Sequence, residues 1–171
     1  MTAEKRREEI RALLANAGGP ISASTLAARF SVSRQVVVGD IALLRAAGLE
    51  ISATPRGYVM LRRTGGLLRK VACLHSLEDT GRELYAMVDN GCAVLDVVVE
   101  HPIYGQLTGP LQLHSRYEVD RFLDKLSAAA PPLSALTGGI HLHTLSCPDE
   151  AAYRRVLETL EKEGILLTEN T

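Results

Sequence analysis

The sequence predicts an α+β protein built from two domains, residues 1–65 and residues 66–171. Helical periodicities followed by a short β-hairpin pattern fill the first part, whereas strands and helices alternate in the second. Charge divides the chain similarly. Residues 1–70 hold 12 Lys and Arg against 5 Asp and Glu, a net charge of +7, and residues 71–171 hold 7 against 15, a net charge of −8. The basic first part therefore favours a polyanionic partner.

The composition, 46% hydrophobic and 23% charged residues, is that of a folded globular chain. The sequence has no apolar stretch near the roughly 18 residues that a membrane helix needs, and its start, MTAEKRREEIR, is too charged for a signal peptide. We therefore expect a cytoplasmic protein with no membrane partner. The three scattered cysteines predict small buried thiols in a reducing compartment rather than a disulfide framework. They are Cys73, Cys92 and Cys147.

Three helices are predicted in the first part. They run from Ala3 to Ala17, from a cap at Ser24 to Phe30, and from a cap at Ser33 through Arg34 to Ala47. Gly18, Gly19 and Pro20 stop the first helix, and Gly48 closes the third. Ile21, between the first two helices, is expected to pair in a short strand.

The third helix has the pattern of a DNA recognition helix. Val37, Ile41 and Leu44 form its inward stripe. Its first turn carries Arg34 and Gln35, which suit guanine and adenine in a major groove, and Ser33 is placed for a phosphate. A plain three-helix bundle with a solvated charged face is the alternative at this point.

A predicted hairpin after the helices favours DNA binding. Its strands are Leu49–Ala53 and Tyr58–Arg62, and the turn between them carries Arg56 at its tip. This order resembles the winged helix-turn-helix of biotin-repressor-type and other bacterial regulators, from residue 1 to about residue 63. The resemblance implies that Arg56 contacts a minor groove or a phosphate of double-stranded operator DNA. The predicted DNA-binding residues are Ser33, Arg34, Gln35, Arg45 and Arg56.

The second part predicts the order βα(ββ)αβα, a small sheet with helices on one face. The predicted strands are Leu68–Leu74, Cys92–Glu100, Ile103–Leu107 and Ile140–Cys147. The predicted helices are Glu78–Asp89, Arg116–Ala129 and Glu150–Glu163, the last capped by Asp149.

Four of the five histidines fall at the ends of predicted strands, His75 and His101 among them. The other two, His141 and His143, lie two residues apart on one strand, so both imidazoles point to the same side. Two neighbouring neutral imidazoles can chelate a metal, for which His75 and Glu83 are further candidates, and a hydrogen-bonded or solvated pair is the alternative.

Three runs of sequence resemble the signatures of the 3H domain. They are Cys73 to Ser76 (CLHS), Val99 to Gly105 (VEHPIYG) and Leu136 to Thr144 (LTGGIHLHT). The resemblance spans about Val71 to Leu166. With the N-terminal part included, the chain is similar over nearly its full length to the niacin-responsive repressors, the NiaR family formerly called YrxA.

This resemblance implies a dimeric repressor of NAD biosynthesis or niacin uptake genes, with nicotinic acid as corepressor and a divalent transition metal in the 3H domain. By motif, the metal ligands would be His75, Glu83, His141 and His143. Three imidazoles and one carboxylate suit nickel, zinc or iron. His101 is a candidate second-shell residue or effector contact, which Tyr104 would assist, and a structural turn histidine is the alternative.

Two other classes of function compete with a ligand-responsive repressor. A metal with an open position could activate water with Glu100 as the base, which would make the chain a metal-dependent hydrolase fused to a DNA-binding module. The sequence lacks a phosphate-binding glycine loop, a nucleophile elbow and an HExxH motif, so we expect no enzyme. A bare interaction module is the third class, and it would need no aligned histidines.

Overall fold

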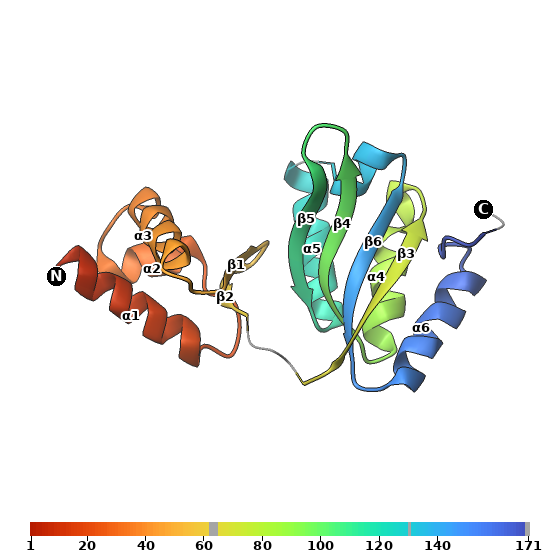
Figure 1. Ribbon diagram of the computed structural model, residues 1–171, viewed down its shortest axis with the longest axis horizontal. Helices are drawn as coiled ribbons and strands as arrows, with labels where there is room; N and C mark the ends of the chain where they lie inside the picture. The colour runs from red at the N-terminus through yellow and green to blue at the C-terminus, as the bar shows by residue number, and fades with distance from the viewer. Residues whose placement is uncertain (62–64, 130, 170–171) are drawn as a thin grey trace. The chain divides into compact units, whose positions relative to one another are not determined.

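The computed structural model describes residues 1–61, 65–129 and 131–169 (Figure 1). The chain divides into two compact units, Met1–Arg63 and Thr64–Thr171, and each has its own hydrophobic core. In the described ranges, no helix is both long and apolar enough to cross a membrane.

The first unit consists of three helices and a two-stranded antiparallel sheet. The elements are α1 (Ala3–Asn16), α2 (Ala23–Phe30), α3 (Arg34–Ala46), β1 (Ile51–Thr54) and β2 (Gly57–Met60). Ser33 caps α3 by accepting a hydrogen bond from Val36 N–H. α2 begins two residues before the predicted start, because its N-cap is Ser22 and not Ser24. Ser22 accepts a hydrogen bond from Thr25 N–H. The predicted strand end at Arg62 lies outside the described residues.

The core of the first unit matches the predicted inward stripe of α3. Val37, Ile41 and Leu44 are buried there, against Ile10 of α1 and Leu26 of α2. These contacts leave the opposite side of α3 exposed, including its first turn.

The second unit is a four-stranded antiparallel sheet in the order β3-β6-β4-β5. Its strands are β3 (Leu67–Leu74), β4 (Ala93–His101), β5 (Gly105–Leu113) and β6 (Ile140–Cys147). Its helices are α4 (Thr80–Asp89), α5 (Arg116–Ala129) and α6 (Glu150–Lys162), with 3₁₀ turns η1 (Leu77–Asp79) and η2 (Leu133–Thr137). Figure 1 shows α4 and α5 behind the sheet and α6 beside β3. The element order confirms the predicted α+β class.

Strand β5 extends well past the predicted Ile103–Leu107 segment. Gly109 and Pro110, which lie beyond the predicted end of the strand at Leu107, pair with Val97 and Asp96 of β4. Because β5 is an edge strand, a proline without an N–H can occupy it. Gly109 also suits its place, since a Cβ there would lie 3.0 Å from Leu133 Cδ1.

The expectation of three free thiols is wrong for two of the cysteines. Cys92 and Cys147 form a disulfide, with their Cα atoms 4.3 Å apart, and Cys73 is the free, buried cysteine. The pairing follows from the sheet, because Ala93 lies opposite Ser146 in the antiparallel β4–β6 pair. Cys92, the residue before Ala93, therefore faces Cys147, the residue after Ser146. Spacing in the sequence carries no sign of this non-local register.

Candidate functional site

Glu83 of α4 lies at the centre of a buried group of histidines in the second unit. Its carboxylate oxygens lie 2.7 Å from His75 Nε2, 2.7 Å from His141 Nε2 and 3.2 Å from His143 Nε2. The four side chains are each at most 4% exposed. The structure thus brings together the four residues that the 3H resemblance implied as metal ligands. We call them the histidine cluster.

The local fold explains why these side chains converge. His141 and His143 alternate with outward residues on β6, so both face the helices. β3 pairs with β6, which brings His75, just after β3, to the start of β6. Gly139 permits this approach: its φ is +99°, and a Cβ there would lie 2.5 Å from the His75 carbonyl oxygen. Glu83 enters from the first turn of α4.

Backbone carbonyls fix the orientation and the tautomer of all three imidazoles. Each Nδ1 lies at hydrogen-bond distance from a carbonyl oxygen, and because a carbonyl only accepts, the Nδ1 must carry a proton. The pairs are His75 with Ser76 at 2.6 Å, His141 with Gly139 at 2.8 Å, and His143 with Asp96 at 2.6 Å. In neutral rings the Nε2 lone pairs then converge on Glu83, as in metal sites whose histidines are oriented by backbone acceptors.

Without a cation, this geometry carries an electrostatic conflict, because a neutral Nε2 presents a lone pair to a carboxylate oxygen. Burial by itself would raise the pKa of Glu83, but the charge on His143 and the hydrogen bonds of the other two histidines outweigh it and hold that pKa well below its usual range. Burial likewise opposes the charged form of His143, yet Glu83 outweighs it and raises the pKa of His143.

His143 Nε2 shows that protons alone do not satisfy the cluster. Although it lies 3.2 Å from Glu83 Oε1, this buried atom has no well-oriented hydrogen-bond partner in the part of the chain that the structure describes. A buried polar atom without a partner is costly. A divalent cation would take up the lone pairs and balance the carboxylate charge, so the residues present fit a transition metal.

Cys73 is a side chain at the cluster that the sequence interpretation treated only as a buried thiol. It lies directly opposite His141 in the β3–β6 pair. Burial, and then the charge of Glu83, raise the pKa of this thiol. The available signal was its position two residues before His75, which places both side chains on the same side of an extended chain.

His101 and Tyr104 lie apart from the histidine cluster, at the turn between β4 and β5. His101 Nδ1 accepts hydrogen bonds from the backbone N–H groups of Ile103 and Tyr104, at 3.1 and 3.3 Å. The His101 and Tyr104 rings have their centroids 5.0 Å apart. These contacts fit the turn-histidine alternative, and the role of both residues in effector binding stays a prediction.

A hollow of about 300 Å³ lies beside this turn, with His101, Gln106, Val98 and Leu142 among its lining residues. Leu142 sits between His141 and His143 on β6, so its side chain points to the other face of the sheet. The hollow and the histidine cluster therefore lie on opposite faces of β6.

The predicted DNA-binding residues lie on α3 and on the hairpin. Arg34 and Gln35 are exposed in the first turn of α3, and Arg56 lies in the turn between β1 and β2. Arg45 contacts the hairpin strands of its own unit. Its Nε donates to the Ile51 carbonyl at 2.7 Å, and its guanidinium carbon is 5.9 Å from the Tyr58 ring centroid.

A buried ion pair that the sequence interpretation missed fixes α3 against α1. Asp40 of α3 is only 3% exposed and accepts from Arg6 Nε at 2.6 Å and from Arg6 Nη2 at 3.3 Å. Arg7 Nη1 is 3.5 Å from the same carboxylate. Because the pair joins residues 34 positions apart, local periodicity does not reveal it.

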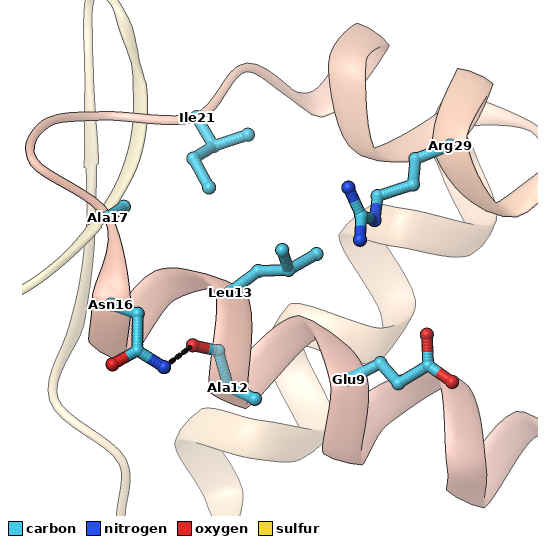
Figure 2. A pocket seen from close by; sticks show the side chains of 7 residues that line it. All are labelled: Glu9, Ala12, Leu13, Asn16, Ala17, Ile21 and Arg29. Carbon is cyan, nitrogen blue, oxygen red and sulfur yellow. Dashed lines mark hydrogen bonds between the residues drawn. The ribbon is translucent and has the colours of Figure 1, made fainter.

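A second hollow, of about 410 Å³, lies in the first unit between α1, Ile21 and α2. Figure 2 shows the apolar side chains of Leu13 and Ile21 on one side of the view and the charged ends of Glu9 and Arg29 on the other. Asn16 closes one side by donating to the Ala12 carbonyl. The hollow contains none of the predicted DNA-binding residues.

Comparison with known proteins assigns both parts of the chain. Residues 6–59 match a helix-turn-helix domain family, and residues 68–169 match the 3H domain. The chain is 42% identical over 167 residues to a probable transcription repressor, NiaR, of Thermotoga maritima, covering 97% of this chain and 95% of that protein. It is also 42% identical over 167 residues to the transcription repressor NadR of Bacillus subtilis, covering 95% of this chain and 93% of that protein.

The 3H match includes the whole histidine cluster, and the helix-turn-helix match includes α3 and the hairpin strands. Both curated relatives are aligned across both units. The chain therefore belongs to the 3H-domain family as a transcription repressor of the NiaR/NadR type, with an N-terminal helix-turn-helix DNA-binding domain.

Proposed function

We propose that this repressor binds operator DNA as a homodimer and that nicotinic acid, or a related small pyridine acid, is its corepressor. The proposed targets are genes of NAD biosynthesis or niacin uptake. The observation that carries the proposal is the histidine cluster, whose Nδ1 atoms face carbonyls and whose Nε2 atoms converge on one carboxylate. This arrangement supports a metal-dependent sensor joined to a DNA-binding domain.

In this proposal His75, Glu83, His141 and His143 hold a divalent transition metal, nickel, zinc or iron. When bound, the cation supplies positive charge to which the carboxylate of a nicotinate-like ligand can bind. The chain's own contribution is orientation, because the carbonyls at Ser76, Gly139 and Asp96 hold the rings whether or not the effector is present. No reaction on the effector is required.

His101 and Tyr104 remain candidates for a contact with the effector or with a partner. The hollow beside these two residues and the histidine cluster lie on opposite faces of β6. We therefore do not propose that one small acid contacts the hollow and the cluster together.

DNA recognition is assigned to the first unit. We infer that Arg34 and Gln35 read base edges, while Ser33 and Arg56 contact the phosphate backbone or the minor groove. Arg45 would act mainly by supporting the hairpin through Ile51. Ser33, Arg34 and Gln35 are exposed. Arg56 is half-buried in the hairpin turn, and Arg45, although exposed, is engaged through its Nε by the Ile51 carbonyl.

Dimerisation is assigned to the second unit, since one helix-turn-helix rarely supplies enough specific contact with DNA. The sheet leaves Leu68 57% exposed and Ile140 45% exposed, which supplies apolar surface for such a contact. Effector binding would favour the dimer in which two copies of α3 meet successive major grooves, about 34 Å apart.

Calorimetric titration of nicotinic acid into metal-loaded protein tests the proposal, followed by a gel-shift assay on the promoter of its own transcription unit. The expected result is saturable binding that tightens the DNA complex, with nicotinic acid recovered unchanged. Metal-loaded protein that binds no pyridine acid would contradict the proposed corepressor. Conversion of the acid would favour the metal-dependent hydrolase.

A further inference from the structure

One sulfur atom lies against the histidine cluster. Cys73 is 0% exposed, and its strand position is directly opposite His141. Cys73 Sγ, a Glu83 carboxylate oxygen and a His141 ring nitrogen all lie within 4.8 Å of one another. The thiol is thus a close neighbour of two members of the cluster, on the same side of the sheet.

An independent feature points to a ligand at the same place. His143 Nε2 is buried, lies 3.2 Å from Glu83 Oε1 and makes no hydrogen bond within the described residues. His141 Nε2 contacts the same oxygen at 2.7 Å. An unsatisfied imidazole nitrogen and a thiol therefore both adjoin the Glu83 carboxylate, and together they form a donor set that suits a cation.

We propose that Cys73 is a sulfur ligand of the cation held by Glu83 and the histidines, and that it makes the site selective for thiophilic divalent metals. The inference rests on the proposed metal site and adds a ligand that the 3H motif does not specify. As the sulfur–metal bond forms, the S–H bond breaks and its proton passes to solvent. No electron is transferred.

The distances allow this coordination with small side-chain movements. Zinc–sulfur bonds are about 2.3 Å and zinc–nitrogen bonds about 2.0–2.1 Å, so a sulfur and a nitrogen ligand of one tetrahedral ion lie roughly 3.6 Å apart. Cys73 Sγ lies within 4.8 Å of the Glu83 oxygen and of the His141 nitrogen, which leaves at most about 1.2 Å to close. A rotation of the Cys73 side chain and a small shift of Glu83 would close the difference.

Sulfur changes which metal the site prefers. Imidazole and carboxylate ligands accept most divalent first-row ions, with affinities that follow the usual order from manganese to copper. Adding a thiolate favours zinc, nickel or cobalt over manganese and magnesium, because soft ligands bind hard cations poorly. Cys73 would then exclude the abundant hard cations of a cell from the sensor.

The test uses full-length protein loaded with cobalt(II), whose near-ultraviolet spectrum reports thiolate ligation. We expect one cobalt per chain with a thiolate-to-cobalt charge-transfer band. Cys73→Ser should still bind cobalt but lose the band. Its affinity for zinc relative to manganese should fall by at least about tenfold, the lower end of the loss when a supporting partner of a metal ligand is removed. The double variant Cys92→Ser/Cys147→Ser is the matched control and should keep the band, because it removes the disulfide pair at the other end of β6 and leaves Cys73 as the one cysteine of the chain.

The outcomes separate this inference from the proposed site. Stoichiometric cobalt without a charge-transfer band in the wild type would overturn the role of Cys73 and leave the histidine site standing. A band that Cys73→Ser retains, or that the folded Cys92→Ser/Cys147→Ser variant loses, would overturn it as well. Absence of metal binding would overturn both. If Cys73→Ser does not fold, X-ray absorption of the zinc-loaded wild type decides: a sulfur neighbour at about 2.3 Å supports the inference, and only nitrogen and oxygen neighbours contradict it.

Discussion

Among the described residues, each unit of this repressor buries one carboxylate, and the two carboxylates have different kinds of partner. Asp40 in the first unit is 3% exposed and is paired with the guanidinium groups of Arg6 and Arg7. Glu83 in the second unit is 1% exposed and faces three imidazoles. Guanidinium groups stay charged at every physiological pH, whereas imidazoles exchange protons and can bind metals.

The comparison teaches that burial of a charge does not by itself indicate a functional site. Asp40 is satisfied inside the chain, and its contacts serve to hold α3 against α1. Glu83 is surrounded by three imidazoles, and the Nε2 atom of one of them, His143, has no hydrogen-bond partner among the described residues. A permanent ion pair supports structure, and a titratable cluster with an unsatisfied donor set supports ligand binding.

The largest expected effect is from removing a ligand of the histidine cluster. Glu83→Gln keeps the side-chain size but removes the charge, and His143→Ala removes one imidazole. Both should reduce bound metal to background, and both should abolish effector-dependent repression while the first unit keeps weak, nonspecific DNA binding. Elemental analysis and gel-shift assays check this.

Asp40→Asn is the matched control for that experiment, and it should leave the metal content unchanged. Stoichiometric metal with a normal effector response in His143→Ala would mean that the cluster is a structural group of histidines.

Asp40→Asn is expected to act only on the first unit. An amide cannot neutralise two guanidinium groups, so α1 and α3 lose their tie and α3 is less well fixed for DNA. We expect the unfolding midpoint of the first unit to fall by roughly 4–8 °C, and affinity to fall for every DNA sequence alike. Differential scanning calorimetry measures the first change. An unchanged midpoint would show that the ion pair does not stabilise the unit.

Substitutions at the exposed surface of the first unit should change base preference and leave its stability unchanged. Replacing Arg34 or Gln35 with Ala should reduce discrimination at one base position by about 1–3 kcal/mol, the value of a bidentate base contact. Arg56→Ala should weaken all sequences more evenly. Binding to a panel of operator variants distinguishes the two patterns. If Arg34→Ala and Gln35→Ala together left operator selection intact, α3 would not be the reading element.

The smallest effect is the pH dependence of stability, which should differ between the metal-free and the metal-loaded second unit. In the metal-free second unit the lowered pKa of Glu83 stabilises the fold above about pH 4.3, and this contribution is lost as pH falls through the folded pKa. The raised pKa values of His75 and His143 stabilise it below about pH 6.5, and this contribution is lost as pH rises through their folded values.

Stability of the metal-free second unit should therefore decrease above neutrality, by at most about 1.4 kcal/mol per pH unit for each proton. Metal-loaded protein should show the opposite trend, because protons compete with the metal for Nε2. Urea unfolding between pH 5 and pH 8 measures the slope with and without metal, and equal slopes would contradict the assignment.

Local sequence patterns predicted most of the fold because most of its elements are locally encoded. Ser33 and Asp149 cap the helices that follow them, and spacing alone placed His141 and His143 on one face. The β5 strand was predicted too short because Pro110 breaks a central strand but not an edge strand, and edge position is set by the other strands.

The features that sequence reasoning missed all depend on non-local register. The Asp40 ion pair, the Cys92–Cys147 disulfide and the position of Cys73 opposite His141 each join segments more than 30 residues apart. The motif resemblance supplied His75 and Glu83, and the sheet explains why they meet. It also explains why His101, in a similar motif, stays at a separate turn.

The histidine cluster also has a consequence for folding kinetics. Its hydrogen bonds join residues 58 positions apart between His141 and Glu83, and 47 positions apart between His143 and Asp96. We expect such distant contacts to form late, after β4 and β6 have paired, because loop closure must precede them. Interactions absent from the folding transition state slow unfolding and leave the folding rate nearly unchanged. Metal should therefore lower the unfolding arm of a chevron plot and leave the folding arm in place. Because the loaded protein then unfolds slowly, it should also release its metal slowly.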